Sequence, residues 1–193
     1  MNAFRILSQT HESLRVAVIG VPAEGWDLPT PCAEWTVAQV VRHATVDQLL
    51  FAVALGKAEQ PEEDAFAPST DRPEDPGTYI KDALGIVGNA WATVDPAGGP
   101  VPTPVPPHQL PAEQAALAAA LDAGVHAWDI AVATGQPSSL TDEVAVALHG
   151  LAVHLVDPLR PWGAYADAIA DDGNGGAVAS LLRYLGREPG WAP

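Results

Sequence analysis

Hydrophobic residues recur at helical spacing in several segments, and stretches rich in proline and glycine separate these segments. In the first segment, for example, Leu7, Leu14 and Val18 lie on one side of a helix. The alternation typical of strands is nearly absent, so the pattern predicts an all-α fold. The predicted helices cover about residues 2–19, 36–55, 77–94, 111–135, 141–156 and 177–185.

Several helix ends carry recognisable signals. Thr36 and Gln39 form a T-x-x-Q capping box, in which the threonine oxygen accepts a backbone N–H and the glutamine reaches back. Pro111 suits a first helical turn, where its missing N–H costs nothing, and Gly135 suits the end of the same helix. Thr141 begins the next helix, with acidic neighbours at its positive end. These signals support the predicted boundaries.

The connections between the helices differ in composition. Residues 26–35 contain two prolines and two tryptophans, which predict a rigid connector packed against the helices. Residues 57–76 are acidic and broken by proline, which favours a surface loop. Residues 95–111 contain seven prolines in seventeen residues and predict an extended crossover, in which the VPTPVP stretch can form a short hairpin arm.

Three long helices precede this crossover and a fourth follows it. The order predicts a four-helix bundle with a long proline-rich connection. A length of 193 residues favours a single domain, residues 1–193. We expect residues 2–156 to form its core and residues 157–193 to form a short, partly helical C-terminal tail.

The fourth predicted helix combines an apolar side with a polar one. Its apolar stripe consists of Leu117, Leu121, Val125, Trp128 and Val132. Asp122, His126 and Asp129 lie on the neighbouring stripe, although the helix is otherwise rich in alanine. Because side chains four apart stack on a helix, Asp122 and His126 can point at a common spot.

The second predicted helix places His43 on its inward side, with Asp47 one turn further on. Facing helices that each contribute histidine or carboxylate are a known way to build a metal site in a bundle. Two histidines and the carboxylate of Asp122 would leave open positions on Zn²⁺ or another divalent ion, as a catalytic site requires. Asp47 and Asp129 would either orient the two imidazoles or face solvent.

Two simpler interpretations of these residues stay open. A single inward histidine on an apolar helix, such as His43, is more often a hydrogen-bonded core residue than a ligand. Asp122 and His126 are also compatible with a helix-surface pair that contributes only a few tenths of a kcal/mol. The pattern alone therefore suggests a metal site without requiring one.

The charge of the chain excludes one broad class of function. Lys and Arg number 9 against 24 Asp and Glu, which gives a net charge of −15 and a pI of about 4.4. Such an acidic chain repels phosphate backbones, so nucleic-acid binding is excluded as the main activity. We predict no signal peptide, no membrane span and a single cysteine in a reducing compartment, which together indicate a cytoplasmic protein.

The remaining candidate residues carry weaker signals. Cys32 is either a reactive thiol or a packed side chain in its tryptophan-flanked loop. We interpret His149 and His154, five residues apart, as core or groove residues, and predict no partner for His11 or His108. The six tryptophans are interpreted as core or interface anchors.

Three stretches of the chain resemble a known family. They are WDLPTPCAEWTVAQVVRH at 26–43, LDAGVHAWDIAVATGQ at 121–136 and LLRYLGREPGW at 181–191. They resemble the DinB-like superfamily, and within it the actinobacterial metal-binding branch related to mycothiol-dependent maleylpyruvate isomerase. The two longer motifs, W-x-x-P-T-P-C-x-x-W-T-V-x-x-x-x-x-H and D-x-x-x-H-x-W-D-x-A-x-A-T-G, are moderately specific.

The resemblance implies an up-down-down-up four-helix bundle in which His43, Asp122 and His126 hold a divalent metal. Zinc is the first choice, with nickel, iron or manganese as alternatives. The isomerase relatives carry Glu where this chain has the shorter Asp122, and they carry a further C-terminal domain, so isomerase activity itself is not carried over.

The function expected from this resemblance is a metal-dependent transferase, isomerase or hydrolase that acts on a small molecule with mycothiol. The alternative is a non-catalytic, dimeric module that binds a metal or a small molecule. Relatives are often homodimers, and neither nucleic acid nor a membrane is an expected partner.

Overall fold

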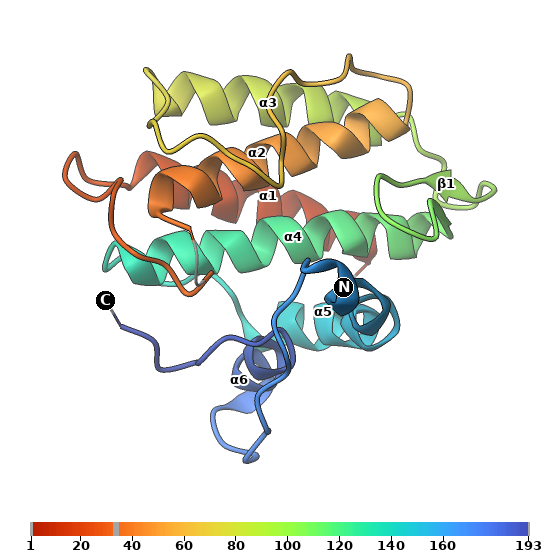
Figure 1. The fold of residues 1–193 in the computed structure, drawn as a ribbon. Coiled ribbons are helices and arrows are strands. Elements are labelled where there is room, and N and C mark those ends of the chain that lie inside the picture. Colours follow the sequence, from red (N-terminus) through yellow and green to blue (C-terminus); the bar gives the residue numbers. More distant parts are fainter. Residues whose placement is uncertain (1, 33–34, 193) are drawn as a thin grey trace.

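The computed structural model describes residues 2–32 and 35–192 (Figure 1). Its elements are α1 (Ala3–Ile19), α2 (Val37–Ala54), α3 (Pro76–Trp91), β1 (Val101–Pro102), β2 (Gln109–Leu110), α4 (Ala112–Ala133), α5 (Asp142–Leu155), the 3-10 helix η1 (Asp157–Trp162) and α6 (Gly176–Tyr184). The only sheet among the described residues is the two-stranded pair of β1 and β2. The predicted all-α class is therefore confirmed.

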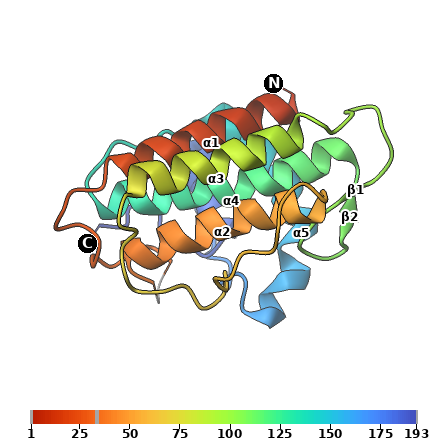
Figure 2. The same cartoon turned by 90° about the horizontal axis from the view of Figure 1, so that it is seen from above.

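The helices α1 to α4 lie side by side. α1 packs against α4 and α3, and α2 packs against α3 and α4, so the four helices close a ring. α1 and α4 run in one direction and α2 and α3 in the opposite direction (Figure 2). Because α2 and α3 are parallel, the segment 55–75 between them has to cross back along the bundle.

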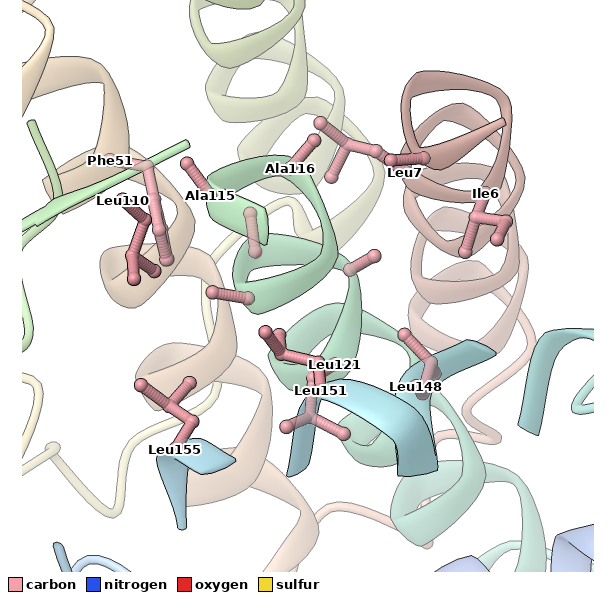
Figure 3. Packing of buried hydrophobic residues seen from close by; sticks show 14 of the residues in the cluster. Ile6, Leu7, Phe51, Leu110, Ala115, Ala116, Leu121, Leu148, Leu151 and Leu155 are labelled. Carbon is pink, nitrogen blue, oxygen red and sulfur yellow. The ribbon is translucent and has the colours of Figure 1, made fainter. Parts of the chain in front are cut away.

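α4 is the central helix of the molecule, and it is buried along most of its length. The sequence pattern predicted one apolar stripe, but α5 packs on a further side of α4, and α6 packs against α5. Figure 3 shows Leu121 of α4 in one cluster with Leu148 and Leu151 of α5. α4 is long and apolar enough to cross a membrane, yet 83% of the relevant window is buried inside the protein, as in the core helix of a globular bundle. On the polar side of α4, His126 and Asp129 are buried as well.

The predicted helix ends are close to the observed ones. Thr36 caps α2, and the capping box with Gln39 is present. Thr141 caps α5 through Val144 N–H. Pro111 is the residue that precedes α4 instead of its first residue, and Gly135, with a φ of 70°, follows the end of that helix.

Two of the predicted connections have clear structural roles. The proline-rich crossover folds into the β1–β2 hairpin, with Val101 opposite Leu110. The connector 26–35 is bonded to the start of α2, because Val37 N–H donates to the Leu28 carbonyl at 3.1 Å and Ala38 N–H to the Trp26 carbonyl at 2.9 Å. Residues 33 and 34 of this connector lie outside the described residues.

Candidate metal centre

The three predicted ligands come together where α2 crosses α4. His43 lies in the middle of α2, and Asp122 and His126 lie one turn apart on α4. One ligand atom from each lies within 4.8 Å of the other two. Asp122 Oδ1 is 3.6 Å from His43 Nε2 and 3.4 Å from His126 Nε2. The shorter aspartate side chain therefore reaches both histidines.

Hydrogen bonds at Nδ1 determine the tautomer of both imidazole rings. His43 Nδ1 lies 2.7 Å from the Ala65 carbonyl oxygen, and His126 Nδ1 lies 2.9 Å from Asp129 Oδ2. Both partners only accept hydrogen bonds here, so Nδ1 carries the hydrogen in each neutral ring. Each Nε2 then presents a lone pair toward Asp122.

The resulting arrangement suits a metal cation. Two nitrogen lone pairs and a carboxylate oxygen face one another, and the N–O distances of 3.4 and 3.6 Å are too long for good hydrogen bonds. Tetrahedral zinc with ligand bonds of about 2.0–2.1 Å places neighbouring ligand atoms about 3.3 Å apart. The two observed N–O distances are close to that value.

Gln48 is a site residue that the sequence analysis missed. Its side-chain amide donates to Asp122 Oδ2 at 2.8 Å, and its Oε1 lies 2.8 Å from Nε2 of His11. The prediction that His11 has no partner is therefore wrong. The available signal was a polar glutamine in the interior of the largely apolar second helix.

Asp129 joins the centre to the C-terminal tail. Besides His126, its carboxylate accepts two hydrogen bonds from the buried guanidinium of Arg187, from Nε at 2.9 Å and from a terminal nitrogen at 2.8 Å. Burial opposes the charge of Asp129, but Arg187 and His126 outweigh this effect and lower its pKa to about 2. A buried, bidentate ion pair therefore fixes the acceptor that orients His126.

The other predicted orienting residue, Asp47, does not contact the ring nitrogen of His43, because the Ala65 carbonyl occupies that position. Asp47 is buried, and no hydrogen bond from the described residues reaches it. Burial first, and then the nearby charge of Asp122, raise the pKa of Asp47 to about 7. Its carboxyl lines the same pocket as the three ligands.

Charges also couple the candidate ligands to one another. Burial opposes protonation of His43, yet the carboxylate of Asp122 outweighs it and raises the pKa of His43. Burial likewise opposes ionisation of Asp122, but His43 and His126 lower its pKa. The carboxylate of Asp122 is thus available as an anionic ligand at neutral pH.

A pocket of about 680 Å³ opens onto this centre, a size within the range of small-molecule sites. The ring of Trp35 lies 4.6 Å, centroid to centroid, from that of His43, and the ring of Phe66 lies 6.2 Å from it. Phe66 and Trp162 line the pocket although they are 65% and 84% exposed. The centre therefore lies in a largely aromatic and apolar pocket.

Cys32 also lines this pocket. Its sulfur, a ring nitrogen of His126 and an oxygen of Asp129 lie within 4.8 Å of one another. Asp129 already accepts three hydrogen bonds, so this trio is a poorer metal site than His43, Asp122 and His126. Cys32 therefore belongs to the wall of the pocket.

The three remaining histidines, His108, His149 and His154, lie away from the centre. The ring of His149 on α5 lies 5.2 Å, centroid to centroid, from the ring of Tyr184 on α6, and the two planes are tilted by 42°. His154 is exposed, so its interpretation as a core or groove residue is wrong, since it lies on the outer side of α5. His108 is exposed in the hairpin loop.

We expect Asp47→Asn to stabilise the metal-free protein at alkaline pH. The pKa of Asp47 in the folded protein, about 7, lies above its value in the unfolded chain. Between about pH 4 and pH 7 the folded protein therefore keeps a proton on Asp47 that the unfolded chain loses. The free energy of unfolding of the wild type falls as the pH rises through this range. The variant should therefore be more stable by roughly 2–4 kcal/mol at pH 8 and close to wild type at pH 4. Urea unfolding of the chelator-treated proteins at both pH values measures this difference in stability. A variant that is stabilised equally at pH 4 and pH 8 would contradict the prediction.

The helices and the centre define a class of protein: an all-helical fold in which two histidines and a carboxylate converge with a spacing that could hold a metal ion. A family model described as the mycothiol maleylpyruvate isomerase N-terminal domain matches residues 7–131, and the chain belongs to this family. The family is linked to mycothiol and to a metal.

Two relatives of the chain are uncharacterized proteins from two strains of Mycobacterium tuberculosis. Each is 27% identical to the chain over 183 residues, which cover 93% of this chain and 94% of the relative. No solved structure matches the chain. The match to the family model includes His43, Asp122, His126 and Asp129 and ends before the tail that supplies Arg187.

Proposed function

We propose that the protein is a divalent-metal-dependent enzyme that uses a low-molecular-weight thiol, mycothiol, to act on a small molecule. The reaction would be thiol transfer, thiol-assisted isomerisation or hydrolysis. One observation carries the proposal: two imidazole lone pairs and a carboxylate oxygen converge at a pocket of about 680 Å³, in a chain that belongs to a mycothiol-related family.

His43, Asp122 and His126 would hold the metal, and zinc is the ion that best suits two nitrogens and one oxygen at this spacing. When bound there, a divalent ion lowers the pKa of a thiol or water and polarises a carbonyl group. Three protein ligands would leave a further position for a thiol, a water or the substrate, as catalytic zinc sites require.

The residues around the ligands would prepare the site for this chemistry. The Ala65 carbonyl and Asp129 keep the histidine lone pairs directed inward. Trp35 and Phe66 shield His43 from water and offer apolar surface to a substrate. Asp47, a carboxyl without a hydrogen-bond partner among the described residues, is placed at the pocket wall to accept a proton from an incoming thiol. A cytoplasmic location would supply the reduced thiol.

The experiment compares zinc-loaded and chelator-treated protein for mycothiol consumption with a panel of small electrophiles. We expect thiol consumption that requires both the protein and the metal, and that returns when zinc is added back to the treated protein. Zinc and mycothiol binding without turnover of any electrophile would favour the non-catalytic binding module instead. Failure to bind zinc would overturn the proposal.

A further inference from the structure

Gln48 joins three helices at the candidate metal centre. It lies on α2 and its side chain is fully buried. Its amide nitrogen donates to the Ala119 carbonyl at 3.1 Å and to Asp122 Oδ2 at 2.8 Å, both on α4. Its Oε1 lies 2.8 Å from Nε2 of His11 on α1. This chain of contacts leads from α1 to the carboxylate that faces both histidines.

The hydrogen-bonding capacity of each group allows only one orientation of the Gln48 amide. The Ala119 carbonyl and the Asp122 carboxylate are both acceptors, so the two amide hydrogens must point at them. Oε1 then faces His11, whose Nε2 must carry a hydrogen in order to donate to it. Every polar atom of the Gln48 side chain is thus satisfied inside the core.

The two carboxylate oxygens of Asp122 have different contacts. Gln48 holds Oδ2, while Oδ1 is the atom that lies 3.4 Å and 3.6 Å from the histidine nitrogens. Without this donor the carboxylate could rotate about its side-chain bonds or turn both oxygens toward a cation. Donors to a metal-bound carboxylate fix its orientation in the same way.

We propose that Gln48 is a positioning residue that makes Asp122 a one-oxygen ligand of the metal, and that His11 holds Gln48 in place. The proposal rests on the metal-binding part of the proposed function. It assigns a role to Gln48 that is separate from the stability that a buried amide gives to the fold.

The test is zinc affinity, measured by competition with a chromophoric chelator, for the wild type and for Gln48→Met. Methionine keeps the length of the side chain and removes both hydrogens that reach α4. We expect zinc affinity to fall by about 10- to 100-fold, the usual effect of losing a group that orients a ligand. The absorption bands of the Co²⁺-loaded variant should also shift, because the coordination of Asp122 changes.

Two further measurements separate positioning from a structural effect. In an Asp122→Asn background, Gln48→Met should cause no further loss of zinc affinity, because Gln48 acts through the Asp122 carboxylate. Gln48→Asn, whose amide is one methylene too short to reach Oδ2, should reproduce the loss if the methionine variant does not fold.

Each outcome has a distinct meaning. Wild-type zinc affinity and a wild-type Co²⁺ spectrum in a folded Gln48 variant would overturn the role of Gln48 and leave the proposed function intact. An equal loss in the wild-type and Asp122→Asn backgrounds would also overturn it. A wild-type protein that binds no zinc would overturn the proposed function and this proposal with it.

Discussion

Replacement of His126 by alanine is expected to abolish stoichiometric zinc binding. The change removes one of three converging ligand atoms and leaves His43 and Asp122 with a gap that water must fill. Loss of a residue that merely orients a ligand costs about 10- to 100-fold in metal affinity, so loss of the ligand itself should exceed about 100-fold. His43→Ala should have the same effect, because its Nε2 occupies an equivalent position.

Metal analysis after zinc loading and gel filtration measures this effect. His154→Ala is the matched control, since His154 is an exposed histidine on α5, and it should retain one zinc per chain. Retention of one zinc per chain by both His43→Ala and His126→Ala would show that the metal binds elsewhere. Circular dichroism of each metal-free variant verifies that the fold persists.

Among the substitutions proposed here, we expect Asp129→Asn to lower the free energy of unfolding the most. Arg187 would remain buried with its charge uncompensated, and breaking a buried pair in this way costs about 3–5 kcal/mol. The variant would also lose the charged acceptor on His126 Nδ1, so zinc affinity should fall together with the free energy of unfolding.

Urea unfolding of the chelator-treated proteins measures the stability effect. Asp172→Asn is the matched control, because Asp172 also pairs with an arginine, Arg183. The side chain of Asp172 is 56% exposed, and such exposed pairs contribute at most about 1 kcal/mol to stability. Because the pKa of Asp129 is lowered to about 2, its contribution is fully present above about pH 4 and is lost as pH falls toward 2. A variant as stable as wild type at pH 7 would contradict the importance of the pair.

The three candidate ligands could be proposed from the sequence because each of them obeys helical periodicity and because the family resemblance implies the set of three. Asp122 and His126 are four apart on one helix, and His43 lies on the inward side of another. Helix-end signals such as the Thr36 capping box also depend only on residues close together in the sequence. They predicted the ends of α2 to within one residue.

The partners of these ligands could not be predicted, because they come from irregular or distant segments. Ala65 reaches His43 only because the acidic loop folds back over α2, and the i+4 spacing had pointed to Asp47 instead. Arg187 lies 58 residues from Asp129 and follows the last helix, where no periodicity indicates which way a side chain points. Gln48 meets His11 across the packing of two helices, and that packing is not encoded in either one alone.

The ion pair between Asp129 and Arg187 also sets the smallest fragment of the chain that can be studied. The segment matched by the family model, residues 7–131, contains every candidate ligand and would look sufficient for a recombinant fragment. Cut there, it would bury the carboxylate of Asp129 without its cation and would leave one face of α4 without α5, which covers it. Truncation experiments should therefore keep the segment through Arg187, because that residue belongs to the same folding unit as the metal centre.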